Sequence, residues 1–362
     1  MQQGPLTQRG PLTLQEPLTL QEPLSRRDRL APSESLGEAR NLGPVDSEPV
    51  FRGEPLLEIV ELVQARLAAG ASSVAFWVID PDLGRGRYAG ELVDAGGGER
   101  FVHRSWRVWA ELAERLQLRL LTPRRDGALV RIALERLGGI ERWGAGAAAP
   151  AEAASERYGA ESRYARVSKL EDPGFVLDFA DALARAAPGP GARILDLGVN
   201  TGDELALIQH LTPVLRDTAR FVGVDHSASA LAVARARFPG PNVELVEGDL
   251  NRLAELALGT FDLVISLNTL QSAGIDDREV LRRIVQHHLA PTGAVILGLP
   301  NSRYVDGELE YGARMRNFRQ PELGLLVKDV AFYRKYLQQH HRQVFVTGKH
   351  YLLVTAVCAP AA

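Results

Sequence analysis

Apolar and polar residues follow two different rhythms along the chain. In the first half, apolar positions spaced by three and four residues predict helices, and alternating runs predict strands. The predicted helices cover residues 55–70 and 103–117, and the predicted strands cover residues 72–80, 118–123 and 128–137. These elements indicate a small α+β unit of ordinary domain size.

Beyond about residue 190, short apolar strands alternate with helices. The expected strands cover residues 192–198, 221–225, 243–249, 261–267 and 293–300, and the expected helices cover residues 203–211, 227–238 and 278–289. This alternation predicts a parallel sheet with helices on both faces. A helix over 329–340 follows, and then two strands joined by a two-residue turn at Lys349 and His350. This hairpin requires one terminal strand to run antiparallel.

Two segments lack this patterning. The first 25 residues repeat with a period of six, and a proline recurs in each repeat. Proline at this spacing prevents a helix, so we expect a disordered tail. A second segment, rich in glycine, alanine and proline, is typical of a linker. The predicted organisation is a tail over 1–48, an accessory α+β domain over 49–143, a linker over 144–154 and a second domain over 155–362.

Composition narrows the class of protein. Of 362 residues, 45% are hydrophobic and 24% are charged, and the net charge is -3, which is typical of a globular protein. Cys358 is the single cysteine, so we expect no disulfide within the chain and a reducing, cytoplasmic location. We find neither an apolar run of about 18 residues nor a secretion signal, and we therefore expect no membrane span. The Cys and His spacing predicts no metal site.

The sequence ILDLGVNTGDE contains the most informative residues, because a strand is expected to turn into a helix there. An open α/β sheet binds its ligands at such turns. Gly198 and Gly202 let the backbone approach a ligand closely, and the amides that begin the helix favour an anion. Asp196 precedes the first glycine, which disfavours a pyrophosphate and differs from the GxGxxG pattern of dinucleotide sites.

Acidic residues also end the next two predicted strands. Asp225 closes the second strand, where a carboxylate can accept hydrogen bonds from both hydroxyls of a ribose. Asp249 follows the third strand and is placed to accept from an exocyclic amine, while Leu250 can lie against a base. Three acidic strand ends in succession therefore predict a nucleoside pocket.

With these residues, the chain resembles the class I S-adenosylmethionine-dependent methyltransferases over about residues 155–362. The resemblance implies a Rossmann-like, doubly wound α/β sheet with an antiparallel last strand, and S-adenosylmethionine as cofactor. It places the methionine end of the cofactor at Asp196, Gly198 and Gly202. It places the ribose at Asp225 and the adenine at Asp249 and Leu250. Asn200 stands where the family often has a third glycine, and asparagine tolerates a left-handed backbone better than most residues.

Further candidates surround this pocket. His226 is expected to touch the ribose or the adenine, and Asn268 ends the fourth strand near the cofactor. The catalytic residues stay unassigned, because methyl transfer requires mainly proximity and a dry, oriented pocket. The candidates nearest the transferred methyl group are Asn268, Asn301 and Tyr304.

A polar insertion over residues 300–324 is interpreted either as a substrate lid or as an ordinary solvated loop. Its candidate substrate residues are Arg303, Tyr311 and Arg314. Tyr164, in the segment before the first strand, is a fourth candidate and could equally be a packing residue.

Several functions fit these predictions. The favoured one is methyl transfer to a small metabolite or a modified nucleoside. One alternative is an RNA methyltransferase that binds RNA through its accessory domain, whose arginines include Arg104, Arg107, Arg124, Arg125 and Arg131. Another is a methyltransferase-like protein kept for binding, which the unusual Asn200 leaves open. The sequence assigns no oligomeric state.

Overall fold

The structure is a computed structural model that describes residues 48–94, 98–138, 156–272, 274–311 and 324–359. The predicted linker, and all but the last residue of the predicted tail, lie outside the described residues. The division of the chain into domains therefore stays a prediction.

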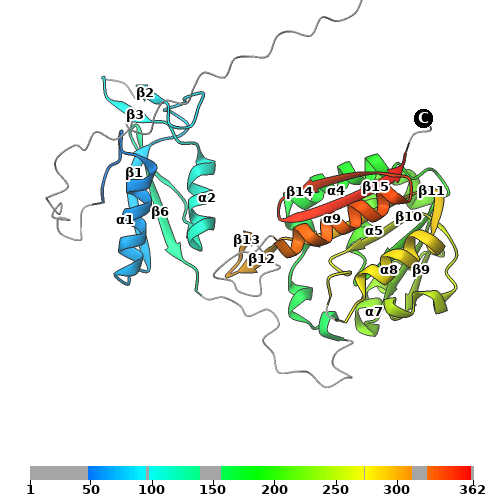
Figure 1. Cartoon of the computed structure of the whole chain (residues 1–362). Helices are drawn as coiled ribbons and strands as arrows, with labels where there is room; N and C mark the ends of the chain where they lie inside the picture. The colour runs from blue at the N-terminus through cyan, green and yellow to red at the C-terminus, as the bar shows by residue number, and fades with distance from the viewer. Residues whose placement is uncertain (1–47, 95–97, 139–155, 273, 312–323, 360–362) are drawn as a thin grey trace, which may run out of the picture. The chain divides into compact units, whose positions relative to one another are not determined.

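An antiparallel sheet with two helices forms the described part of the first half (Figure 1). Strand β6 lies at its centre and pairs with β1, β4 and β5, while β2 and β3 form a separate pair. The elements are α1 (Leu56–Ala68), β1 (Ser73–Ile79), β2 (Leu92–Asp94), β3 (Arg100–Val102), α2 (Trp106–Leu116), β4 (Leu118–Leu120), β5 (Arg124–Asp126) and β6 (Leu129–Arg136). Both helices and the longer strands confirm the apolar pattern, whereas the three-residue strands β2, β3 and β5 were not predicted. Phe76, Trp109 and Ile132 are buried at the core of this unit.

A seven-stranded sheet organises the second half, in the order β14-β15-β11-β10-β7-β8-β9. The strands are β7 (Arg193–Leu197), β8 (Arg220–Asp225), β9 (Val243–Glu247), β10 (Phe261–Leu267), β11 (Leu289–Pro300), β14 (Arg342–Gly348) and β15 (Tyr351–Cys358). Strand β15 lies between β11 and β14 and runs antiparallel to both, and the other neighbours are parallel. The doubly wound sheet with its antiparallel last strand is confirmed.

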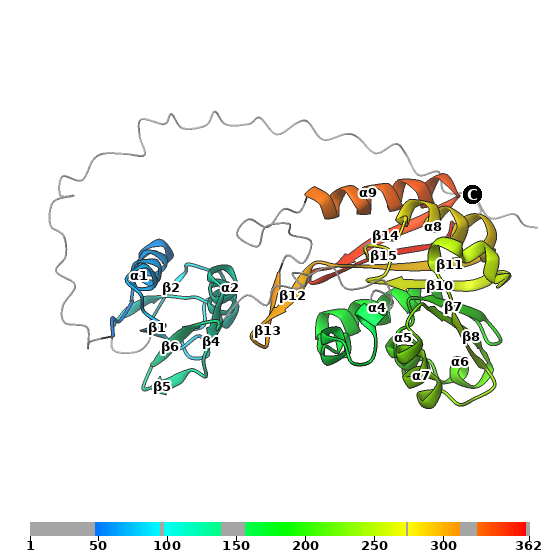
Figure 2. The same cartoon turned by 90° about the horizontal axis from the view of Figure 1, so that it is seen from below.

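Two helical layers cover this sheet (Figure 2). The helices are α4 (Pro173–Ala186), α5 (Asp203–Leu211), α6 (Pro213–Thr218), α7 (Ala228–Arg237), α8 (Asp277–Arg283) and α9 (Gly324–Gln339). Alternate residues of the strands pack against α4, α5, α6 and α7 on one face and against α8 and α9 on the other. Because both faces are covered, the central strands β8 and β10 are buried along nearly their whole length, as the sequence indicates, whereas the edge strand β9 exposes Glu244 and Glu247.

Short helical turns connect the longer elements. The 3-10 turns η2 (Glu156–Tyr158), η3 (Arg163–Arg166) and η4 (Lys169–Glu171) precede α4. Turn η5 (Leu250–Leu256) follows β9, and a π-helical turn, η6 (Ile284–His288), follows α8. In the predicted insertion, β12 (Ser302–Val305) and β13 (Glu308–Tyr311) form a hairpin, and residues 312–323 lie outside the described residues. Among the helices that the structure describes, none has both the length and the apolarity of a membrane span.

Candidate methyl-donor site

The loop between β7 and α5 approaches the loop after β10 very closely. Gly198 has a φ of 82°, and a Cβ there would overlap the side chain of Thr269. Gly202 begins α5 with a φ of 86°. Both glycines therefore suit the positive φ that the backbone adopts here, and their close approach to a ligand stays a prediction. The carboxyl ends of β7 and β10 are neighbours because the two strands pair in parallel.

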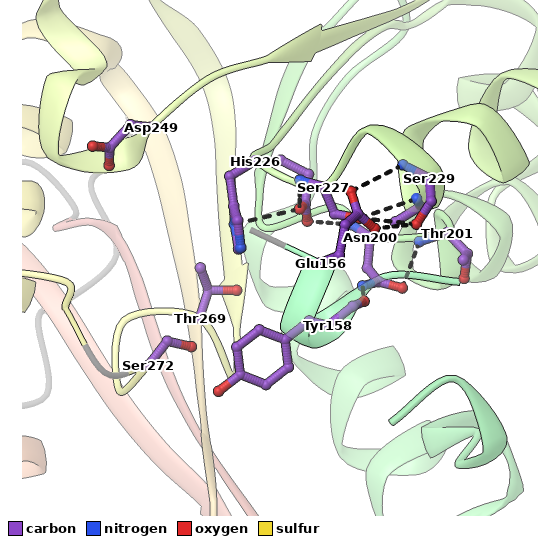
Figure 3. A network of polar contacts seen from close by, with 12 residues as sticks. Glu156, Tyr158, Asn200, Thr201, His226, Ser227, Ser229, Asp249, Thr269 and Ser272 are labelled. Atoms are coloured by element: carbon purple, nitrogen blue, oxygen red, sulfur yellow. Dashed lines mark hydrogen bonds and ion pairs between the residues drawn. The ribbon is translucent and has the colours of Figure 1, made fainter. Parts of the chain in front are cut away.

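Asn200 occupies a left-handed conformation in this loop, with a φ of 47°. Its backbone amide donates to Oδ2 of Asp225 at 2.8 Å, and its Oδ1 accepts from the amide of Thr201 at 2.9 Å. Its Nδ2 donates to the carbonyl of Tyr158 at 2.6 Å (Figure 3). The turn thus forms with asparagine in place of glycine, and the side chain makes contacts that glycine would lack.

Asp225 ends β8 and is almost completely buried. Its Oδ2 accepts from the amide of Asn200, and its Oδ1 accepts from the amide of Ser227 at 2.9 Å. Two backbone donors thus fix the carboxylate, and each oxygen can still accept another hydrogen bond. His226 is exposed beside it, with Nδ1 3.6 Å from Oδ1 of Asp225.

A buried group of charges lies behind the loop. Lys169, before α4, pairs with Oε1 of Glu204 in the first turn of α5. Both oxygens of Asp196 are buried without a hydrogen-bond partner among the described residues. Burial, and next the carboxylate of Glu204, raise the pKa of Asp196 well above its ordinary value. Burial opposes the charge of Lys169, but the attraction and hydrogen bond of Glu204 and the nearby charges of Asp203 and Asp196 together outweigh it, so the pKa of Lys169 is raised.

Neither Glu204 nor its pairing with Lys169 is predicted from the sequence. An acid in the first turn of a helix is ordinarily explained by the helix dipole, and Glu204 carries no further signal in the sequence. Lys169 lies 35 positions away from it. The pairing depends on how η4 packs beside α5, which no local pattern specifies.

The residues predicted to hold the adenine follow β9, and the further cofactor candidate Asn268 follows β10. Asp249 is exposed, and its Oδ1 accepts from the amide of Asn251 at the start of η5. Leu250 is buried in the core beneath α8. Asn268 has a φ of 60°, and its Oδ1 is buried without a hydrogen-bond partner in the described part of the chain. Contact of these residues with a base stays a prediction.

The candidates on the acceptor side lie on separate elements of the chain. The side-chain Nδ2 of Asn301 donates to the carbonyl of Lys349 at 2.9 Å and so holds the turn between β14 and β15. Burial, and next the charge of Tyr351, raise the pKa of Tyr304. The Tyr164 ring packs against Tyr158, with centroids 4.7 Å apart.

The other substrate candidates are only partly described. Tyr311 ends β13 opposite Ser302. The backbone of Arg303 belongs to β12, but its side chain lies outside the description, as does the whole of Arg314. Their role in binding an acceptor stays a prediction. In the described ranges, His, Cys, Asp and Glu form no cluster of three or more that could hold a metal ion.

Comparison with known proteins identifies the domain that carries this site. Residues 194–293 match a family model described as a methyltransferase domain, and they include the loop after β7, Asp225 and Asp249. The chain carries a class I methyltransferase domain. The resemblance inferred from the sequence is thereby confirmed.

Two curated relatives match about a third of the chain. A trans-aconitate 2-methyltransferase of Azoarcus sp. (strain BH72) is 33% identical over 122 residues, which is 34% of this chain and 44% of that protein. One of Variovorax paradoxus (strain S110) is 32% identical over 123 residues, again 34% of this chain and 44% of that protein. The chain thus spans less than half the length of these relatives. A solved SAM-dependent methyltransferase of Aquifex aeolicus is 15% identical, covering 54% of this chain and 98% of its own, with a TM-score of 0.37.

The comparisons indicate S-adenosylmethionine as the cofactor of the methyltransferase domain, and the residues fit it. The molecule has an ammonium group, a sulfonium and a ribose diol. Asp196 offers two buried oxygens that no donor in the described chain satisfies, which suits an ammonium group. Asp225 is oriented by two amides and keeps acceptor capacity for a diol.

Proposed function

We propose that this protein transfers the methyl group of S-adenosylmethionine to a small metabolite. The observation that carries the proposal is the pair of acids at the ends of β7 and β8. Asp196 is buried without a partner among the described residues, and Asp225 is held by two backbone amides. A buried carboxylate without a donor is costly, so its presence at a ligand-binding edge indicates a cationic ligand.

The chain's own residues bind and orient in this proposal. Asp225 accepts from the ribose hydroxyls, and Asp196 accepts from the ammonium group. The cofactor supplies an activated methyl group on a sulfonium, whose bonding pair stays on sulfur as the methyl leaves. Catalysis then requires that the two reactants be aligned and that water be excluded.

A small acceptor is favoured over RNA for two reasons. Both curated relatives are named for a small carboxylic acid, trans-aconitate. Two of the arginines that suggested RNA binding are already engaged within the first unit: Arg104 is buried and donates to the carbonyl of Glu54, and Arg125 pairs with Asp80 and Asp82.

The test is transfer of a labelled methyl group by the full chain. Trans-aconitate, other small carboxylic acids, nucleosides and total RNA are offered separately, and labelled products are separated by mass. The proposal predicts label in a low-mass product. Label in RNA would instead support the RNA methyltransferase, and cofactor binding without turnover on any acceptor would support the binding protein. For the variant Asp225→Ala, the matched control is Glu244→Ala, which removes an exposed acid of β9 and should turn over normally.

Other properties of the proposed enzyme rest on the sequence alone. A cytoplasmic location follows from the single cysteine.

A further inference from the structure

A short segment before α4 is fastened to the methyl-donor site at two points. Residues 156–160, which we call the strap, contain the turn η2 and lie against the start of α7 and the loop after β7 (Figure 3). The strap is separated in sequence from its partners by 42 to 73 positions. Its attachment is therefore tertiary, and it consists of specific polar contacts.

The first attachment joins the strap to α7. The carboxylate of Glu156 accepts from the hydroxyls of Ser227 and Ser229, and at 3.4 Å from the amide of Ser229. The amide of Ala160 donates to Oγ of Ser229 at 3.0 Å. A carboxylate at a helix N-terminus is stabilised by the amides and the dipole there. These hydrogen bonds, with that from Ser229 first, lower the pKa of Glu156, so it is ionised at neutral pH.

The second attachment joins the strap to the cofactor loop. Nδ2 of Asn200 donates to the carbonyl of Tyr158, while Oδ1 of the same side chain accepts from the amide of Thr201. The side chain that replaces a glycine of the family pattern is thus the one that holds the strap. Both attachments converge on Asp225, which accepts from the amides of Asn200 and Ser227.

The strap also brings an aromatic ring to the site. In Figure 3 the ring of Tyr158 points toward the loop that carries Thr269 and Ser272, which follows β10. The ring packs against Tyr164, and the guanidinium of Arg157 lies 5.8 Å from its centroid. A strap that is fastened therefore holds this ring near the loop that packs on Gly198.

We propose that Asn200 and Glu156 are positioning residues that fasten the strap across the methyl-donor site and so fix both Asp225 and the ring of Tyr158. This inference rests on the proposed function, because Asp225 is its link to the cofactor. The side chain of Asn200 then has a role of its own, beyond the tolerance of asparagine for a left-handed backbone. With the strap detached, Asp225 loses rigidity on both sides, and the site is open to water at Tyr158.

Replacement of Asn200 by glycine separates these two roles. Glycine is the residue best suited to positive φ, so a purely conformational role predicts unchanged or improved stability and cofactor binding. Loss of two side-chain hydrogen bonds predicts instead that the Kd for S-adenosylhomocysteine rises about 5- to 50-fold. Glu156→Gln keeps the shape but removes the charge, and should raise the Kd by about 3- to 10-fold.

Two controls match these variants. Ala257 has a φ of 48° on an exposed turn, so Ala257→Gly introduces glycine at the same conformation without touching the strap. Glu161→Gln removes an exposed carboxylate just beyond the strap. Neither control should change the Kd.

The experiment measures the Kd for S-adenosylhomocysteine by calorimetry and amide hydrogen exchange of residues 156–160, on the full chain. The expected result is weaker binding and faster exchange of the strap in Asn200→Gly and Glu156→Gln, with the midpoint of global unfolding nearly unchanged. If wild type binds and Asn200→Gly binds equally tightly with unchanged exchange, the strap proposal is overturned. If wild type itself does not bind, the proposed function fails instead.

Discussion

Replacing Asp225 by alanine should remove most of the affinity for the cofactor. The side chain ends β8, and its two oxygens already accept from the amides of Asn200 and Ser227. In the proposed site each oxygen also accepts from one ribose hydroxyl. Alanine removes all four of these hydrogen bonds without adding bulk.

The size of the effect follows from the charge of the acceptor. A hydrogen bond to a charged group contributes about 1.5–3 kcal/mol, so two lost ribose contacts amount to roughly 3–6 kcal/mol. This corresponds to an increase of about 10²- to 10⁴-fold in Kd. Loss of the two loop contacts raises the Kd further, because the amide of buried Ser227 is left without its acceptor and the loop after β7 loses its support.

Calorimetric titration of the full chain with S-adenosylhomocysteine measures the change directly. A thermal melt of the same sample shows whether the variant is folded, and Glu244→Ala on the neighbouring strand β9 controls for loss of one acidic residue. The reasoning would be refuted by a folded Asp225→Ala variant that binds within about threefold of wild type, which is under 1 kcal/mol.

Three further substitutions test the buried part of the site. Gly198→Ala places a Cβ against Thr269 at a positive φ and should lower the free energy of unfolding by about 2–4 kcal/mol, measured in urea; an unchanged midpoint would contradict the close approach. Lys169→Met leaves Glu204 as an unpaired buried charge and should lower the free energy of unfolding by about 3–5 kcal/mol. The double variant Lys169→Met with Glu204→Gln should recover part of this loss. A loss below about 1 kcal/mol in Lys169→Met would argue against the pair. The raised pKa of Asp196 means that the folded state prefers the neutral form of this carboxyl group. The stability that the neutral group provides is fully present below its ordinary pKa of 3.8 and is lost as the pH rises through the raised pKa. Asp196→Asn should therefore melt above wild type at about pH 8 and equal to it near about pH 3, whereas an equal shift at both values would contradict the assignment.

Much of the second half of the chain was predictable because the residue pattern of each element depends on what that element packs against. A strand such as β10 is apolar on both faces since helices cover both, and β15 follows β14 after a two-residue turn, which allows only an antiparallel pair. The acids at the ends of β7 and β8 were found for a similar reason. A strand end followed by a helix start is a local signal, and its position in an open sheet has a general meaning.

The contacts that complete the site were not predictable in this way. Glu156 meets Ser229 and Lys169 meets Glu204 only because the segment before α4 packs over the loop and helix ends, which no periodicity records. Leu250 shows a different limit. An apolar residue after a strand end suits either a ligand or the core, and only the packing of η5 reveals that it is buried in the core.

The central claim is that the ends of β7 and β8 bind S-adenosylmethionine. The most direct measurement is a calorimetric titration of the full chain with S-adenosylhomocysteine, with NAD as the control ligand. We expect saturable binding of S-adenosylhomocysteine in the roughly micromolar range and no binding of NAD. Absence of heat with S-adenosylhomocysteine from a folded sample, or equal binding of both ligands, would contradict it.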